Sequence, residues 1–333
     1  MAMKKFINNP DNLTPELLEG YCAAFPSKVK LVSDKIVMRA QPKDASKVAI
    51  VTLGGSGHEP ALSGFVGEGM LDASVVGDVF AAPGAPKVLE ALKLLKRDAG
   101  ILFVVLNHAG DVMSGNMALE MAEAEGIKVK MILTHEDIAP GADAPVADRR
   151  GLAGCIPLYK VAGAAAEAGK SLDEVFEIAE RFNNQMATLA VAISTATHPQ
   201  SGGAIFELAD DEMEIGMGQH GEAGTGRSKL LSADETAEKM IARLLPAVKA
   251  ASGDKLHLMI NGTGATTLME LFILFRKTSQ YIKEQGMRVE HSLVGEYLTV
   301  QEMGGFQMFV AKLDDELLGL LNAPADAPYW TVR

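Results

Sequence analysis

The chain has 333 residues, of which 48% are hydrophobic and 22% charged, which is typical of a globular protein long enough to form two cores. Its net charge of −12 argues against a nucleic-acid partner, which would need a basic face, and against binding to an anionic membrane surface. No apolar run approaches the length of a membrane span, and the N-terminus lacks the apolar core of a signal peptide. We therefore expect a cytoplasmic protein.

The first half of the chain alternates short apolar runs with helical patterns, which predicts parallel strands connected by helices. Each of its first two predicted strands ends in a polar or glycine-rich loop. The predicted elements are a strand at Val48–Leu53, a helix at Pro86–Lys96, a strand at Ile101–Leu106, a helix at Met117–Glu125 and a strand at Val129–Leu133.

The second half repeats this alternation after a helical region at Val161–Asn184. Ser171 with Glu174, and Ser232 with Glu235, have the spacing of capping boxes that begin helices. The predicted strands are Thr188–Ser194, Leu256–Ile260, Val289–Val294 and Phe306–Ala311, with helices ending near Ala250 and Gln285.

The pattern as a whole predicts two α/β domains, 1–185 and 186–333. We expect each to be a mainly parallel or mixed sheet flanked by helices, with an active site in the cleft between the domains.

Two histidines lie in glycine-rich loops far apart in the sequence. His58 is in the loop Gly54–Pro60, and His220 is in the loop Gly216–Glu222. Glycine permits positive φ and lets a ligand approach the backbone, so these loops are suited to present an imidazole rather than to fill a core. We expect the two loops to cooperate in one active site.

Asp111 is the third candidate site residue. Ligands of open α/β sheets bind beyond the carboxyl ends of the strands, and both the His58 loop and the loop Asn107–Asp111 follow a predicted strand. We therefore expect His58 and Asp111 at one edge of one sheet, with His220 coming from the second domain. Each also has a structural interpretation, His58 and His220 as turn residues and Asp111 as a helix N-cap.

Other interpretations of these loops are weaker. The glycines of the His220 loop have the spacing of a dinucleotide-binding motif, but no helical pattern follows and no acidic residue lies about 20 positions on. Two histidines and an aspartate could bind zinc or iron, but the chain has no closely spaced histidine pair, and we expect no metal. His108 stays open between a surface and a pocket position. The other histidines are expected to be structural: His135, His198, His257 and His291.

Seven stretches of the chain together resemble the K subunit of dihydroxyacetone kinase. They span almost the whole sequence: Gly54–Pro60, Gly110–Asp111, Arg149–Gly151, Asn183–Gln185, Glu214–Gly224, Asn261–Glu270 and Asp326–Trp330.

The resemblance implies a homodimeric two-domain α/β protein that binds a short ketose covalently. His220 would add a ring nitrogen to the ketone carbonyl to give a hemiaminal, and His58 with Asp111 would bind the substrate and deprotonate its terminal hydroxyl. The backbone of Gly55, Ser56 and Gly57 would contact the sugar.

The resemblance also implies partner subunits. The phosphoryl donor would be an adenine nucleotide, ADP or ATP with Mg²⁺, carried by a separate L subunit. A phosphoenolpyruvate-dependent M subunit would recharge that nucleotide in one branch of the family, and ATP would exchange in another. No donor domain follows Trp330, so we expect the chain to be inactive alone and to bind no cofactor itself.

The chain departs from the family pattern at positions near the expected site, which leaves dihydroxyacetone, a tetrulose such as erythrulose or another small ketone open as substrate. These departures are Leu53, Ala82, Leu106, His108 and Ala109. Two alternatives to a kinase subunit remain: a ketose-sensing transcriptional co-regulator without turnover, and a metal-dependent hydrolase or aldolase.

Overall fold

The computed structural model of the protein describes residues 5–222, 224 and 226–333, which form two compact units. We call them the His58 unit, made of residues 5–134, Cys155–Arg181 and Gly319–Arg333, and the His220 unit, made of the described residues in His135–Gly154 and Phe182–Leu318. None of the helices in the described part of the chain has the length and apolar run needed to cross a membrane.

The helices are α1 (Leu13–Ala24), α2 (Ala85–Leu94), α3 (Ala109–Ala124), α4 (Cys155–Glu167), α5 (Leu172–Asn183), α6 (Ala233–Ala247), α7 (Leu268–Glu284) and α8 (Asp315–Asn322). The strands of the first half are β1 (Val29–Ser33), β2 (Ile36–Arg39), β3 (Ala49–Ser56), β4 (Ala73–Val79), β5 (Ile101–Leu106) and β6 (Val129–Thr134). Those of the second half are β7 (Met186–Ala192), β8 (Glu212–Ile215), β9 (Arg227–Lys229), β10 (Lys255–Gly262), β11 (Arg288–Gly295), β12 (Gly305–Leu313), β13 (Ala325–Ala327) and β14 (Trp330–Val332).

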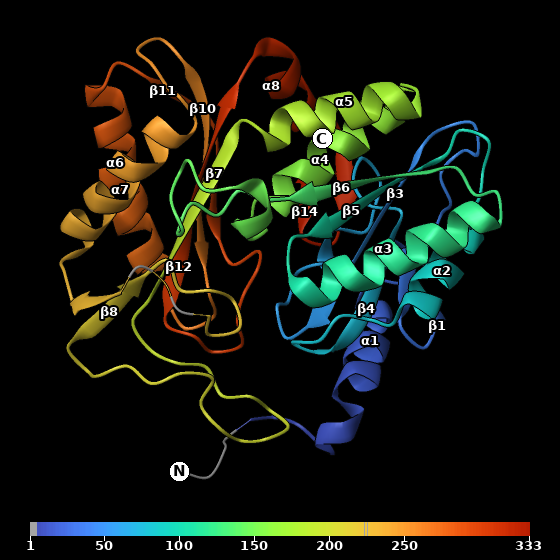
Figure 1. Ribbon diagram of the computed structural model, residues 1–333, viewed down its shortest axis with the longest axis horizontal. Coiled ribbons are helices and arrows are strands. Elements are labelled where there is room, and N and C mark those ends of the chain that lie inside the picture. Colours follow the sequence, from blue (N-terminus) through green and yellow to red (C-terminus); the bar gives the residue numbers. More distant parts are fainter. Residues whose placement is uncertain (1–4, 223, 225) are drawn as a thin grey trace. The chain divides into compact units, whose positions relative to one another are not determined.

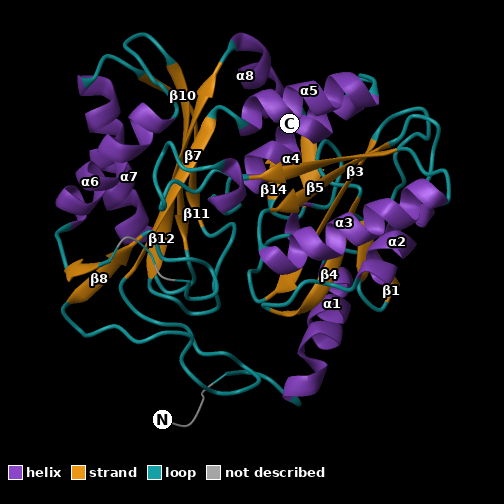
Figure 2. Cartoon of the chain, in the orientation of Figure 1, coloured by secondary structure: helices purple, strands orange, loops and turns teal. Residues whose placement is uncertain are grey.

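The sheet of the His58 unit has the strand order β1-β2-β4-β3-β5-β6, in which β4, β3, β5 and β6 are parallel and β1 and β2 pair antiparallel. Val51 and Leu53 of β3 belong to a core that includes residues of α2 and α3, the helices labelled together in Figure 2. Between these two residues, the Thr52 hydroxyl forms a hydrogen bond of 2.9 Å with the hydroxyl of Tyr159 on α4. Burial on both faces explains why β3 and β5 are continuous apolar runs in the sequence.

The sheet of the His220 unit has the order β11-β10-β12-β7-β8-β9, with β10 and β11 parallel and the other pairs antiparallel. Helices α6 and α7 lie side by side along this sheet (Figure 1). Their Met240, Ile241 and Leu271 form one core with Leu258 and Val310 of the sheet. The predicted fold class, two α/β domains with mixed sheets, is therefore confirmed.

The boundary between the two units is not a single division near residue 185, because two segments cross it. Residues 135–154 join the His220 unit because Thr188 of β7 donates to the carbonyl of Glu136 at 2.8 Å and accepts from the N–H of Ile138. Residues 319–333 return to the His58 unit, where the Asp326 N–H donates to the Glu68 carbonyl at 2.9 Å. Hydrophobic periodicity marks strands and helices but not the sheet that each segment joins.

Two of the histidines expected to be structural form a pair in the His220 unit, in which His291 is half-buried. His257 on β10 is fully buried, and its Nδ1 lies 2.6 Å from the Nδ1 of His291 on β11. The rings stack with centroids 4.6 Å apart, and Phe309 packs edge-on against His257. Only one proton can lie between the two nitrogens. Burial, and then the charge of His291, holds the pKa of His257 well below its ordinary value.

This pair predicts that the protein loses stability in mild acid. Below about pH 6.5 His257 is protonated in the unfolded chain but stays neutral in the folded chain. The free energy of unfolding therefore decreases as the pH is lowered, by up to about 1.4 kcal/mol per pH unit. Urea denaturation between about pH 7 and 5 measures this slope. We expect His257→Gln, which keeps a hydrogen-bonding group but does not titrate, to flatten it. If His257→Gln showed the same dependence of unfolding free energy on pH as the wild type, His257 would not be the cause of the loss in acid.

Candidate active site

His58 lies in the loop that follows β3, and the ring of Phe80 packs against it. The two ring centroids are 5.2 Å apart, and His58 is only 7% exposed. Phe80 has a φ of +57°, which is unusual for a bulky residue. Its ring fills the space beside Gly57, where an added Cβ would lie 2.8 Å from the ring. Glycine at position 57, whose φ is +97°, therefore lets Phe80 hold the imidazole in place.

A neighbouring turn lies directly against Gly55. A Cβ at this position would lie 2.8 Å from the backbone nitrogen of Ala81 and 3.1 Å from the carbonyl oxygen of Asp78. Both atoms are backbone, so a larger residue could be admitted only by moving the turn away from β3. The glycine thus fixes the distance between the His58 loop and the turn that carries Phe80.

Ser56 and Gly57, two of the expected substrate-binding residues, already make internal hydrogen bonds. The Ser56 hydroxyl is buried 3.0 Å from the hydroxyl of Thr14 on α1. The Gly57 N–H donates to Oε1 of Glu59 at 2.9 Å. Burial raises the pKa of Glu59, although the bond from Gly57 acts in the opposite direction. These contacts hold the loop together, and the role of its backbone toward a sugar stays a prediction.

Asp111 lies in the first turn of α3, which follows β5. Because β5 and β3 are neighbouring parallel strands, Asp111 and His58 follow strands that end at the same edge of one sheet, as predicted. The helix begins earlier than the sequence indicated, at Ala109, and its N-cap is His108. Asp111 is therefore not an N-cap. Its half-buried carboxylate lies where the amide dipoles of the helix favour negative charge.

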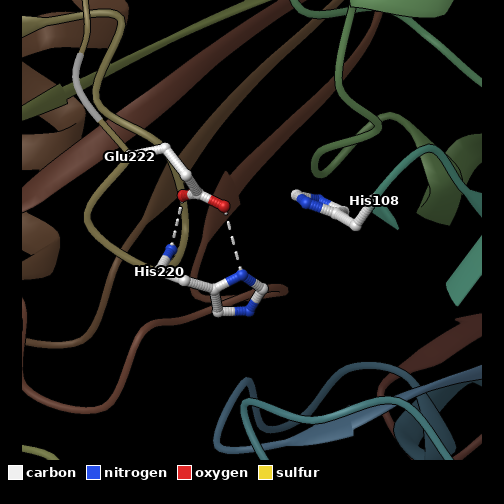
Figure 3. Close-up of side chains that lie close together, drawn as sticks. All are labelled: His108, His220 and Glu222. Carbon is white, nitrogen blue, oxygen red and sulfur yellow. Dashed lines mark hydrogen bonds and ion pairs between the residues drawn. The ribbon is translucent and has the colours of Figure 1, made fainter. Parts of the chain in front are cut away.

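His220 follows β8 on the second glycine-rich loop, and Glu222 binds it twice (Figure 3). The His220 N–H donates to Oε2 of Glu222 at 2.9 Å, and ring atom Nδ1 lies 3.3 Å from Oε1. Burial acts to raise the pKa of Glu222, but the hydrogen bonds and charge of His220 outweigh it and hold that pKa well below its ordinary value. One carboxylate thus fixes both the backbone and the ring of His220.

Arg150 anchors the start of the His220 loop. Its Nη2 donates to the Gly216 carbonyl at 2.7 Å, and its Nε donates to Asp137 at 2.7 Å. The N–H of Gly218 donates to the Glu222 carbonyl at 2.8 Å, which closes the loop on itself. A side chain at Gly218 would collide with the Glu222 carboxylate and the Arg150 guanidinium, so both of these side chains would have to move to admit it.

The structure therefore brings His58 and Asp111 to one edge of the sheet in the His58 unit, and it places His220 on a loop of the His220 unit. Three supporting residues were not singled out from the sequence. Glu222, two residues after His220, could have been found from that spacing. Phe80 carries no local signal, because a positive φ does not appear in a sequence pattern. Arg150 lies in the stretch Arg149–Gly151 that resembles the family, but its contact with the distant His220 loop could not be read from the sequence.

The close approach at Gly55 predicts that Gly55→Ala lowers the free energy of unfolding by about 1–3 kcal/mol, the usual effect of overpacking. Urea denaturation measures the change. The matched control is Gly20→Ala in α1, where nothing lies within 4 Å of an added Cβ and alanine favours the helix. Equal stability of the two variants contradicts the described contact between the loop and the turn.

A family model described as the Dak1 domain matches residues 19–329. The dihydroxyacetone-binding subunit DhaK of PTS-dependent dihydroxyacetone kinase 1 from Listeria innocua is 40% identical over 329 residues, which cover 98% of this chain and 100% of that protein. L-erythrulose kinase from Pectobacterium atrosepticum is 36% identical over 330 residues, covering 98% of this chain and 56% of that protein.

A solved structure of the dihydroxyacetone kinase operon co-activator Dha-DhaQ superposes with a TM-score of 0.90 at 32% identity, covering 96% of this chain and 98% of the co-activator. The family model covers more than half of the chain, and the relative from Listeria matches over its whole length. The chain therefore belongs to the Dak1 family, the K-subunit family of the dihydroxyacetone kinases.

Proposed function

We propose that this chain is the ketose-binding subunit of a dihydroxyacetone kinase. It holds a short ketose covalently on His220 while a partner subunit phosphorylates the terminal hydroxyl. Family membership supports the reaction class. The observation that carries the proposal is the His220 loop, in which a glycine-rich turn presents an imidazole whose ring and backbone are both fixed by Glu222.

Covalent capture suits a very small substrate. A triose has too few atoms to gain much affinity from ordinary contacts. A neutral imidazole is a competent nucleophile toward a carbonyl, and the resulting bond holds the hydroxyl in place for in-line transfer. Glycerol has no carbonyl and cannot form this bond, so the chemistry itself separates ketose from polyol.

His58 and Asp111 are proposed to act on the substrate hydroxyl. Both follow parallel strands at one sheet edge, where α/β proteins bind their ligands. Phe80 fixes the plane of the His58 ring, as a general base needs, and Asp111 supplies a carboxylate in the first turn of a helix. Gly55, Ser56 and Gly57 would contact the sugar through their backbone.

The phosphoryl group would come from a partner. We expect a nucleotide-carrying L subunit with ADP or ATP and Mg²⁺, recharged either by a phosphoenolpyruvate-dependent M subunit or by exchange with ATP. We further expect a homodimer in the cytoplasm. The relative from Listeria is a subunit of a PTS-dependent kinase, and this similarity supports the branch that uses phosphoenolpyruvate.

Two relatives keep the substrate and the role open. The similarity to an L-erythrulose kinase supports a tetrulose as an alternative substrate. Leu106, His108 and Ala109, which precede Asp111, are the residues that would select between a tetrulose and dihydroxyacetone. The similarity to a co-activator supports a ketose sensor without turnover. Addition of an L-type subunit with its nucleotide separates these roles, because only a kinase subunit then yields ketose phosphate.

Intact-mass spectrometry near neutral pH tests the covalent step. Incubated with dihydroxyacetone or erythrulose, the protein should gain the full mass of the sugar, because addition of an imidazole to a ketone loses no water. Glycerol should add nothing. We expect His220→Ala to gain no mass and the control His198→Ala, in a neighbouring loop of the same unit, to behave like the wild type. An adduct on His220→Ala contradicts the proposal.

The proposed base has a separate prediction. With an L-type partner present, His58→Ala should lower the turnover rate by about 10²–10⁴-fold, the usual contribution of general base catalysis. The adduct on His220 should still form, since that step does not need the base. Turnover is measured as ketose phosphate produced. A variant that turns over at the wild-type rate would show that His58 only supports the loop.

A further inference from the structure

Both oxygens of the Glu222 carboxylate are engaged by a single residue, His220 (Figure 3). Oε2 accepts the backbone N–H at 2.9 Å and Oε1 faces ring atom Nδ1 at 3.3 Å. The first bond sets the position of the backbone, and the second sets the rotation of the ring. If Glu222 served only to stabilise the turn, the bond from the His220 backbone N–H would be sufficient.

The chemistry of the carboxylate determines where the ring carries its proton. The pKa of Glu222 is held well below its ordinary value, so the group is ionised near neutral pH and can only accept hydrogen bonds. A neutral imidazole that faces it through Nδ1 must therefore carry its hydrogen on Nδ1. The lone pair of that tautomer lies on Nε2.

We infer that Glu222 is a positioning residue for the proposed reaction: it holds His220 in the tautomer and orientation in which Nε2 attacks the ketose. This inference rests on the proposed function. Nε2 donates its lone pair to the keto carbon, and the π electrons of the carbonyl move to its oxygen, which takes a proton from water. The imidazolium formed in this step gives the Nδ1 proton back to water, so no atom is lost.

Glu222 also has a part in that charged intermediate. The ring is positive from the moment the bond forms until Nδ1 releases its proton, and a carboxylate 3.3 Å away stabilises this charge. The Glu222 carboxylate and the Arg150 guanidinium both pack against Gly218, where each lies within reach of an added Cβ. Close packing on Gly218 and the bond from the His220 N–H place the carboxylate before the substrate arrives, so little reorganisation is needed.

The test uses Glu222→Gln, which keeps the shape of the side chain and removes its charge. We expect adduct formation with dihydroxyacetone, measured by intact-mass titration, to weaken by about 10–100-fold, the loss typical when the partner that orients a metal-bound histidine is removed. Glu207→Gln, an exposed glutamate in the same unit, is the matched control and should match the wild type. Gly218→Ala displaces the carboxylate without changing its charge and should weaken the adduct in the same direction.

A second readout needs no ketose. ¹⁵N NMR of the ligand-free protein should show His220 with its proton on Nδ1, and Glu222→Gln should move the population toward the Nε2–H form. A purely structural glutamate would leave this signal unchanged. An Nε2–H ring in the wild type, or undiminished adduct in both Glu222→Gln and Gly218→Ala, overturns the inference. A wild-type protein that shows the Nδ1–H signal but forms no adduct contradicts the proposed function, while the tautomer assignment is supported.

Discussion

The absence of a side chain at two glycines is the constraint on which both histidine loops depend. Phe80 occupies the space beside Gly57 and packs against His58, and Glu222 occupies the space beside Gly218 and bonds His220. In each loop a residue other than the histidine fills the volume that a Cβ would take and fixes the imidazole. The lack of a glycine side chain, which lets Phe80 and Glu222 approach the backbone, thus matters here as much as the conformational freedom of glycine.

The two loops are supported in different ways because their sheets differ. The His58 loop leaves β3 in the parallel part of its sheet, which is buried on both faces, so strand ends and a neighbouring turn hold the loop by backbone contact. The His220 loop leaves β8, which pairs antiparallel with β7, and charged groups hold it instead. Asp137 is linked to Thr188 on β7 and positions Arg150, which holds the Gly216 carbonyl. An apolar support would suit the base proposed at His58, and a charged support would suit a ring that is proposed to become positive at His220.

The sequence predicted structure best for strands that are buried along their whole length and for motifs, such as a capping box, that have one structural role. The apolar runs predicted β3 and β5, and the Ser232–Glu235 spacing predicted the start of α6. Strand β4 was missed because Gly77 and Asp78 interrupt its pattern, yet glycine is needed there for the turn at Ala81 to approach. The early start of α3 was missed because Ala109–Asp111 is a typical loop sequence that nevertheless forms the first helical turn. The site histidines stood out, and Glu222 could have been found from its spacing to His220, whereas the roles of Phe80 and Arg150 required coordinates.

The central claim is that the keto carbon becomes bonded to Nε2 of His220. NMR of the ¹⁵N-labelled protein with a ketose labelled with ¹³C at its keto carbon tests this most directly. The account predicts that the keto signal moves from the carbonyl region to that of a tetrahedral carbon bonded to nitrogen and oxygen, with coupling to Nε2 of that ring. A keto signal that stays in the carbonyl region, or a coupling to Nδ1, would contradict it.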